Sequence, residues 1–121
     1  MKISLFASKE DYIAFTKKVN YLVDELIVVD QYDSPIAFLN RDTNKIYSAL
    51  WVATNGAKGI EMVIELQRKL PKSHVVWESD DQNFALTAYE LHPAYFLYKK
   101  GSVITAINNI KRWYHYGYCA V

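Results

Sequence analysis

The run from Ile46 to Ala53 constrains the fold of this chain most strongly, because it is a short and nearly continuous apolar segment. Polar turn residues bound the run on both sides, at 40–44 and at 54–56. An apolar run of this length between turn signals predicts a strand that is buried on both faces rather than a helix. Such strands belong to parallel sheets that helices cover on both sides.

Short apolar segments alternate with segments of helical periodicity along the rest of the chain. The other expected strands are Ile3–Phe6, Leu26–Val29 closed by Asp30, His74–Glu78 and Ala94–Tyr98. The expected helices follow Ser8, begin at Pro35, run over Ile60–Leu70, open at Asp80-Asp81 and begin at Gly101-Ser102. This alternation predicts an α/β fold with a doubly wound five-stranded parallel sheet, of flavodoxin-like order 2-1-3-4-5, and helices on both faces.

The helix expected at residues 60–70 has a predicted buried stripe formed by Ile60, Val63, Ile64 and Leu70. Val63 and Ile64 lie three and four residues after Ile60, and Leu70 lies seven residues after Val63, which places these positions near one face of a helix. Acidic residues early in the segment and basic residues late in it suit the helix dipole. Pro71 is expected to end this helix.

Composition and charge exclude several classes of function. The formal net charge of +1 gives no general attraction to nucleic acid or to an anionic membrane. The single cysteine, Cys119, excludes an internal disulfide framework and is typical of a reducing compartment. No run approaches the roughly 18 apolar residues of a membrane span. We therefore expect a soluble cytoplasmic protein with one domain at residues 1–113 and a tail at 114–121.

Few reactive side chains lie at the carboxyl ends of the expected strands, where open α/β sheets place their sites. Residues 51–54, at the end of the central strand, include no acid, histidine or cysteine. Ser79 ends a strand, but no histidine is placed beside it to act as a base. Cys119 lies in the tail. We therefore predict that the chain is not an enzyme.

The sequence does not support a metal site either. Histidines at 74, 92 and 115 lack the spacing of metal ligands. The Asp80-Asp81 pair is interpreted as the charged start of a helix. The basic pairs Lys99-Lys100 and Lys111-Arg112 are too small to indicate nucleic-acid binding.

The segment Thr54–Gly59 is the main candidate for a ligand-binding loop. It contains Gly56, Lys58 and Gly59 and opens a helix, an arrangement that can bind the phosphate of a flavin or a nucleotide. Its spacing matches neither of the glycine-rich fingerprints that have a known mechanism. Turn geometry is therefore the favoured explanation for both glycines.

Residues 74–100 resemble a known family. The segment Val75–Ser79, followed by Phe84–Lys99, is similar to the second half of a response-regulator receiver domain of the CheY-like type. It most resembles receivers of LytTR-type regulators, whose pattern is a strand ending in Thr-Ala and then YALxAFExxAxDYLLKP. The resemblance extends weakly backwards through Gly59-Ile60-Glu61 to the first strand, and covers about residues 1–112.

The resemblance implies a degenerate site. Receivers accept a phosphoryl group on an aspartate that ends the third strand, and an acidic pair after the first strand holds Mg²⁺. In this chain the acceptor position falls on Trp51, and the acidic pair falls on Ala7 and Ser8. None of these side chains is a carboxylate, so no Mg²⁺ and no other cofactor are expected. A side chain as large as Trp51 is expected to fill the crevice.

The positions through which receivers report their state are retained. Ser79 stands at the Thr/Ser position, Phe96 at the aromatic switch position and Lys99 at the lysine position. The prolines of the two neighbouring motifs are replaced by Asn55 and Lys100.

The resemblance therefore implies a pseudo-receiver that serves two-component signal transduction as a phosphorylation-independent protein-interaction module. Receivers signal through the fourth helix, fifth strand and fifth helix, often as dimers. On this chain that face includes Tyr89, Tyr95, Tyr98, Lys111 and Arg112. Its partner would be another protein or a second copy, with no membrane involved. One alternative is a small flavin- or nucleotide-binding protein. Another is the receiver part of a longer DNA-binding regulator, whose nucleic-acid contacts would belong to another domain.

Overall fold

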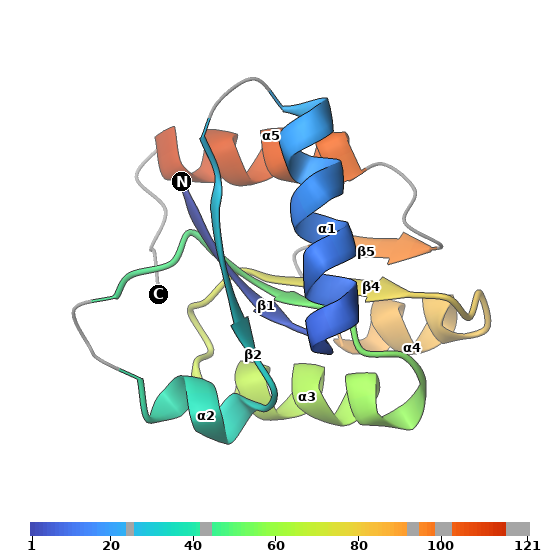
Figure 1. The fold of residues 1–121 in the computed structure, drawn as a ribbon. Helices are drawn as coiled ribbons and strands as arrows, with labels where there is room; N and C mark the ends of the chain where they lie inside the picture. Colours follow the sequence, from blue (N-terminus) through green and yellow to red (C-terminus); the bar gives the residue numbers. More distant parts are fainter. Residues whose placement is uncertain (24–25, 42–44, 92–94, 99–102, 116–121) are drawn as a thin grey trace.

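Five parallel strands form one sheet in the order β2-β1-β3-β4-β5. The strands are β1 (Lys2–Phe6), β2 (Val28–Tyr32), β3 (Ala49–Val52), β4 (Val75–Ser79) and β5 (Tyr95–Tyr98). The computed structural model describes residues 1–23, 26–41, 45–91, 95–98 and 103–115 (Figure 1). The predicted strand order and fold class are confirmed.

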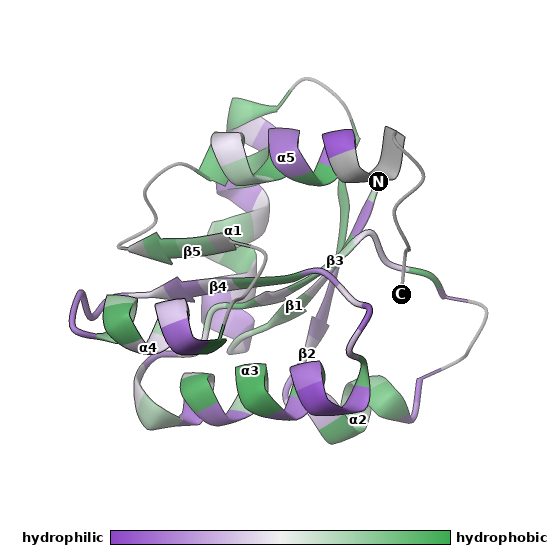
Figure 2. Ribbon diagram, turned by 180° about the vertical axis from the view of Figure 1, so that it is seen from behind, coloured by the Kyte–Doolittle hydropathy of each residue, from purple (hydrophilic) through white to green (hydrophobic). Residues whose placement is uncertain are grey.

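Helices cover both faces of the sheet. They are α1 (Lys9–Leu22), α2 (Pro35–Leu39), α3 (Gly56–Lys69), α4 (Phe84–Leu91) and α5 (Val103–His115). Helices α1 and α5 pack on one face, and α2, α3 and α4 pack on the other. The strands between them are mostly hydrophobic, as Figure 2 shows. None of the described helices has the length and apolar character needed to cross a membrane.

Strand β3 is the centre of the sheet and is buried on both faces, as predicted. Ala49 and Trp51 belong to the core beneath α1 and α5, whereas Leu50 and Val52 belong to the core beneath α2, α3 and α4. This division follows from the alternation of side chains along a strand. The strand is shorter than predicted, because Ile46 is 60% exposed and precedes it.

The predicted position of β2 is wrong by two residues at its start and by three at its end. Leu26 is 80% exposed, and the strand begins at Val28 and continues through Asp30 to Tyr32. The acidic residue was expected to end this strand. An edge strand tolerates it here because the Tyr47 hydroxyl donates a hydrogen bond to the Asp30 carboxylate, at 2.6 Å.

The expected start and buried face of α3 also need correction. The helix begins at Gly56 rather than Ile60, and its buried residues are Gly59, Met62, Val63 and Leu66. Ile64, which was expected in the stripe, is 44% exposed. The segment is rich in apolar residues, so the contact with the sheet decides which of them are buried.

Two further expected boundaries differ from the structure. Helix α4 begins at Phe84 and not at Asp80, because residues 80–83 form the connection that follows β4. Helix α5 begins at Val103 rather than at Gly101-Ser102 and continues to His115, while the expected domain end at residue 113 stays a prediction. The tail from residue 116, with Cys119, lies outside the described residues.

Each of the two glycines in the first turn of α3 has a structural reason. Gly56 has a φ of 73°, a left-handed conformation that other residues rarely adopt. A Cβ atom on Gly59 would overlap the backbone carbonyl of Thr54. Gly59 therefore lets the start of α3 pack directly against the end of β3. These reasons support turn geometry over a phosphate-binding role.

A hydroxyl network connects β2 to the segment before β3. The Tyr47 side chain is fully buried, and its hydroxyl contacts the Tyr32 hydroxyl at 2.7 Å as well as Asp30. Burial, and the hydrogen bonds to Asp30 and Tyr32, raise the pKa of Tyr47. The phenol therefore stays protonated and remains a donor at neutral pH.

We predict that Tyr47→Phe lowers the free energy of unfolding by about 1–3 kcal/mol, because it removes the donor to a partly buried carboxylate. Urea denaturation measures this difference. The matched control is Tyr21→Phe at an 88% exposed position, where a change within about 0.5 kcal/mol is expected. Equal stabilities of wild type and Tyr47→Phe would contradict the role of this network.

Gly59→Ala is expected to destabilise the protein by at least ~1 kcal/mol, since the new methyl group would overlap the Thr54 carbonyl. Alanine ordinarily stabilises a helix interior relative to glycine by about 1 kcal/mol. Ala57→Gly, on the exposed face of the same turn, calibrates that propensity effect. Thermal and urea unfolding of both variants test the prediction, and a Gly59→Ala protein more stable than wild type would refute it.

Candidate functional site

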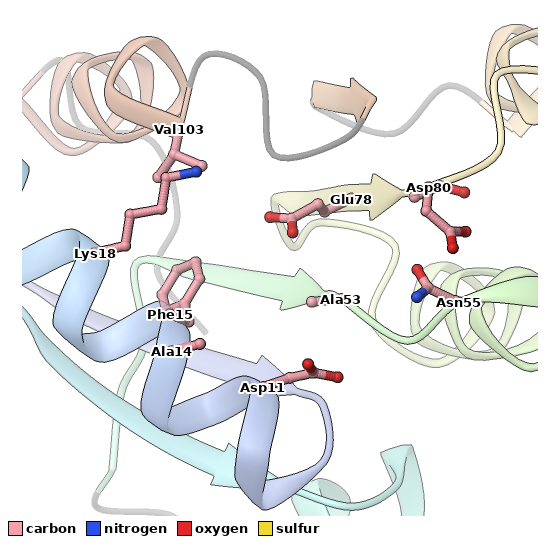
Figure 3. Close-up of a pocket in the computed structure, with 10 residues that line it drawn as sticks. Asp11, Ala14, Phe15, Lys18, Ala53, Asn55, Glu78, Asp80 and Val103 are labelled. Atoms are coloured by element: carbon pink, nitrogen blue, oxygen red, sulfur yellow. The ribbon is translucent and has the colours of Figure 1, made fainter.

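A pocket of about 230 Å³ lies at the carboxyl edge of the sheet (Figure 3). Helix α1, the ends of β3 and β4, and the first residue of α5 surround it. Its lining residues are Asp11, Ala14, Phe15, Lys18, Ala53, Asn55, Glu78, Ser79, Asp80 and Val103. This is the edge at which open α/β sheets bind ligands.

Helix α1 supplies one wall of the pocket through a single stripe of side chains. Asp11, Ala14, Phe15 and Lys18 are spaced by three, one and three residues, so they lie on one face of the helix. The helix is fixed at its start by Ser8, whose hydroxyl accepts a hydrogen bond from the Asp11 backbone N–H at 3.2 Å. The cap therefore sets the orientation of the wall.

Trp51 contacts two residues that line the pocket, Phe15 and Glu78, but does not line the pocket itself. Its side chain is fully buried and packs edge-on against Phe15, with 5.0 Å between the ring centroids. Its indole Nε1 donates a hydrogen bond to Oε1 of Glu78 at 3.2 Å. The pocket is lined by Ala53 and not by Trp51, so the expectation that Trp51 fills the crevice stays a prediction.

Three carboxylates face the pocket, and none was expected there. Asp11 comes from α1, Glu78 from β4 and Asp80 from the residue after β4, and Figure 3 shows their side chains around Ala53. Glu78 was expected at the end of a strand and Asp80 at the start of a helix. The spacing of Asp11 with Phe15 and Lys18 in the sequence indicates that they share one face of α1. The sequence does not indicate that this face lies beside the end of β4, because that contact is tertiary.

The residues present do not fit the Mg²⁺ site that the receiver fold implies. The segment after β1 offers Ala7, a buried methyl group, and Ser8, whose hydroxyl caps α1. Within the described part of the chain, no three Asp, Glu, His or Cys side chains lie close enough together to hold a metal ion. The Asp11, Glu78 and Asp80 carboxylates line the pocket but do not converge on one point.

The end of β1 is also occupied by structural hydrogen bonds. The backbone carbonyl of Ala7 accepts a hydrogen bond from Nε2 of Gln31 at 2.8 Å. The carbonyl of Phe6 accepts one from the Thr54 hydroxyl at 3.0 Å. Thr54 therefore ties the end of β3 to the end of β1.

The other expected site residues have varied positions. Ser79 is buried and lines the pocket, and its Oγ accepts a hydrogen bond from the Asp81 backbone N–H at 3.1 Å. Phe96 packs edge-on against Trp77 at 5.0 Å, on the other face of the sheet from the Phe15 and Trp51 pair. Lys99 and Lys100 lie outside the described residues.

The histidines do not form a common site in the described part of the chain. His74 lies before β4, and burial lowers its pKa. His92 lies outside the described residues, and His115 is placed only as the last residue of α5.

No protein-family model matches the sequence, and a search of curated proteins finds no significant match. Solved structures of receiver domains are similar in fold. The response regulatory domain of MrkE from Klebsiella pneumoniae has a TM-score of 0.65 at 15% identity, covering 96% of this chain and 97% of that one. TrrA from Thermotoga maritima, solved with Mg²⁺ and a beryllium fluoride, has a TM-score of 0.66 at 11% identity, covering 92% and 96%.

The response regulator DrrB from Thermotoga maritima, an OmpR/PhoB homolog, has a TM-score of 0.63 at 15% identity. The match covers 95% of this chain and 52% of DrrB, so the chain spans about half the length of that protein. At these identities the comparisons establish the fold alone. The protein has the fold of response-regulator receiver domains.

Proposed function

We propose that this protein is a receiver-type signalling domain that acts through protein contacts and does not depend on phosphorylation. The observation that carries the proposal is the chemistry at the ends of β1 and β3. Residues 7–8 and 51–54 include no carboxylate, and the polar side chains among them include Ser8 and Thr54, both of which make structural hydrogen bonds. An indole, a methyl or an isopropyl group cannot accept a phosphoryl group from a donor.

The carboxylates of the pocket do not replace the missing acids. Asp11 lies on α1, and Glu78 and Asp80 lie at and after the end of β4, so none of them ends β1 or β3. The Glu78 carboxylate also accepts the hydrogen bond from Trp51. The pattern of residues 84–99 resembles LytTR-type receivers, and we include that affiliation in the proposal.

The proposed contact surface is the face of α4, β5 and α5. On α4, Leu86 is 71% exposed and Tyr89 is 74% exposed, although the helix is short and mostly apolar. Lys111 and Arg112 lie on α5, where Lys111 is partly buried and Arg112 is exposed. Tyrosine and arginine are enriched at protein interfaces. The proposed face also includes the edge strand β5, to which Tyr95 and Tyr98 belong.

A second copy of the chain is the partner we propose for this face, and a longer regulator is a second candidate context. RcsB from Salmonella enterica, solved bound to the rprA promoter, is similar over 93% of this chain and 66% of its own, at 14% identity and a TM-score of 0.66. A regulator of that kind would contact nucleic acid through another domain.

We predict that neither acetyl phosphate nor beryllofluoride, each with Mg²⁺, modifies this protein, because no carboxylate ends β3. Intact-mass measurement and amide NMR spectra of residues 51–54 test the prediction. A receiver that has its acceptor aspartate serves as the positive control under the same conditions. A mass increase of one phosphoryl group, or beryllofluoride-dependent shifts at residues 51–54, would overturn the proposal.

Tyr89→Glu is expected to weaken self-association at least about tenfold, since it places a charge in the apolar part of the α4 surface. Sedimentation equilibrium over a range of protein concentrations measures the dissociation constant. Tyr21→Glu, at a similarly exposed tyrosine on α1, is the matched control and should leave the constant unchanged. A wild-type protein that is monomeric throughout, or equal effects of both substitutions, would exclude a homodimer through this face.

A further inference from the structure

The pocket has an apolar base and a charged rim. Ala14, Phe15, Ala53 and Val103 supply its apolar surface, and Phe15 is held in place by the buried Trp51 ring. Its volume of about 230 Å³ is smaller than the roughly 300–1,000 Å³ of sites for drug-sized ligands. The pocket therefore fits a small group, such as a short alkyl chain with one polar end.

The charges around the pocket are predominantly negative. Its lining includes the carboxylates of Asp11, Glu78 and Asp80 and a single ammonium, that of Lys18. Asp11 and Lys18 are seven residues apart on α1, which corresponds to about 10 Å along the helix. Figure 3 shows the Lys18 side chain extending to Val103, at the α5 side of the pocket. The lining therefore favours a cation over an anion.

The spacing of the carboxylates distinguishes between kinds of cation. A Mg²⁺ ion needs oxygen ligands on one point at about 2.1 Å. No group of acidic, histidine or cysteine side chains in the described residues meets that condition. An ammonium or guanidinium group has three or five N–H donors that point in different directions, so it can bind carboxylates that are apart.

The Trp51 indole fixes one of these acceptors. Its Nε1 donates a hydrogen bond to Oε1 of Glu78, so a fully buried ring orients the Glu78 carboxylate. The amide side chain of Asn55 also lines the pocket, and it makes no capping hydrogen bond to α3. An oriented carboxylate and an amide oxygen beside an apolar wall are acceptors suited to the charged end of an alkyl amine.

We propose that this pocket binds a monovalent organic cation, namely a primary ammonium or guanidinium group at the end of a short alkyl chain. The charged end lies between Asp11, Glu78 and Asp80, and the chain packs against Phe15 and Ala53. The same chemistry is present in a free alkyl amine and in the Lys or Arg side chain of a partner protein. This ligand is independent of dimer formation and of phosphorylation, so its test stands apart from those of the proposed function.

The test is an amide NMR titration of the full chain with n-butylguanidinium and with N-acetylarginine methylamide. We expect saturable shifts at the pocket residues Ala53, Asn55, Ser79 and Asp80. N-acetylcitrulline methylamide, which has the same shape without the charge, should produce no shifts. Binding of butylguanidinium alone would indicate a free small ligand, and binding of both probes would indicate that a partner's side chain can also enter.

Two sets of substitutions remove charge from the pocket without changing its shape. The double variant Asp11→Asn/Asp80→Asn and the variant Glu78→Gln should each weaken binding at least about tenfold. The amide introduced by Glu78→Gln keeps an oxygen acceptor for the Trp51 indole. Glu61→Gln, an exposed acid on α3 that does not line the pocket, is the charge-matched control. The amide spectrum of each unliganded variant verifies that it is folded.

Four results would overturn the assignment. The first is the same shifts with the citrulline compound, and the second is unchanged binding in both pocket variants. The third is a set of pocket shifts that Mg²⁺ alone produces at lower concentration, since this would identify a metal site. Shifts spread over all acidic surface residues would likewise show attraction without a site.

Discussion

The burial of β3 on both faces is the constraint on which the rest of the structure depends. Ala49 and Trp51 require the layer of α1 and α5, and Leu50 and Val52 require the layer of α2, α3 and α4. Neither layer alone would remove these side chains from water. The central position of the strand also brings the ends of β1, β3 and β4 to one edge of the sheet, where the pocket lies.

At that edge of the sheet, side chains make structural hydrogen bonds near the positions where the receiver pattern has its metal-binding and phosphoryl-accepting acids. The Thr54 hydroxyl joins β3 to β1, Gln31 binds the Ala7 carbonyl, and Ser8 caps α1. The Ser8 hydroxyl accepts from a first-turn N–H of α1 that has no partner within the helix, and the Phe6 carbonyl accepts from both the Thr54 hydroxyl and the Ala53 backbone N–H. These hydrogen bonds join the ends of β1, β3 and α1, and a small pocket lies between the elements of this edge.

The pocket and the proposed contact surface are close in the chain. Asp80 lines the pocket, and α4 begins at Phe84, so residues 80–83 connect a ligand-facing carboxylate to the helix that presents Tyr89. The Asp81 backbone and side chain fix this connection through hydrogen bonds with Ser79 and Asn83. A group bound at Asp80 would thus contact the segment that positions α4.

The sequence by itself determined the alternation of strands and helices, the parallel order, and the absence of acids at residues 7–8 and 51–54, since these depend on local pattern and identity. Tertiary structure decided which side chains share a space. Ile64 is exposed while Met62 is buried, because the packing of α3 on the sheet decides which side of the helix is buried. Asp11 lies in the same pocket as Glu78, because the packing of α1 brings it to the end of β4. Such contacts join residues far apart in the chain, so the local periodicity of the sequence does not predict them.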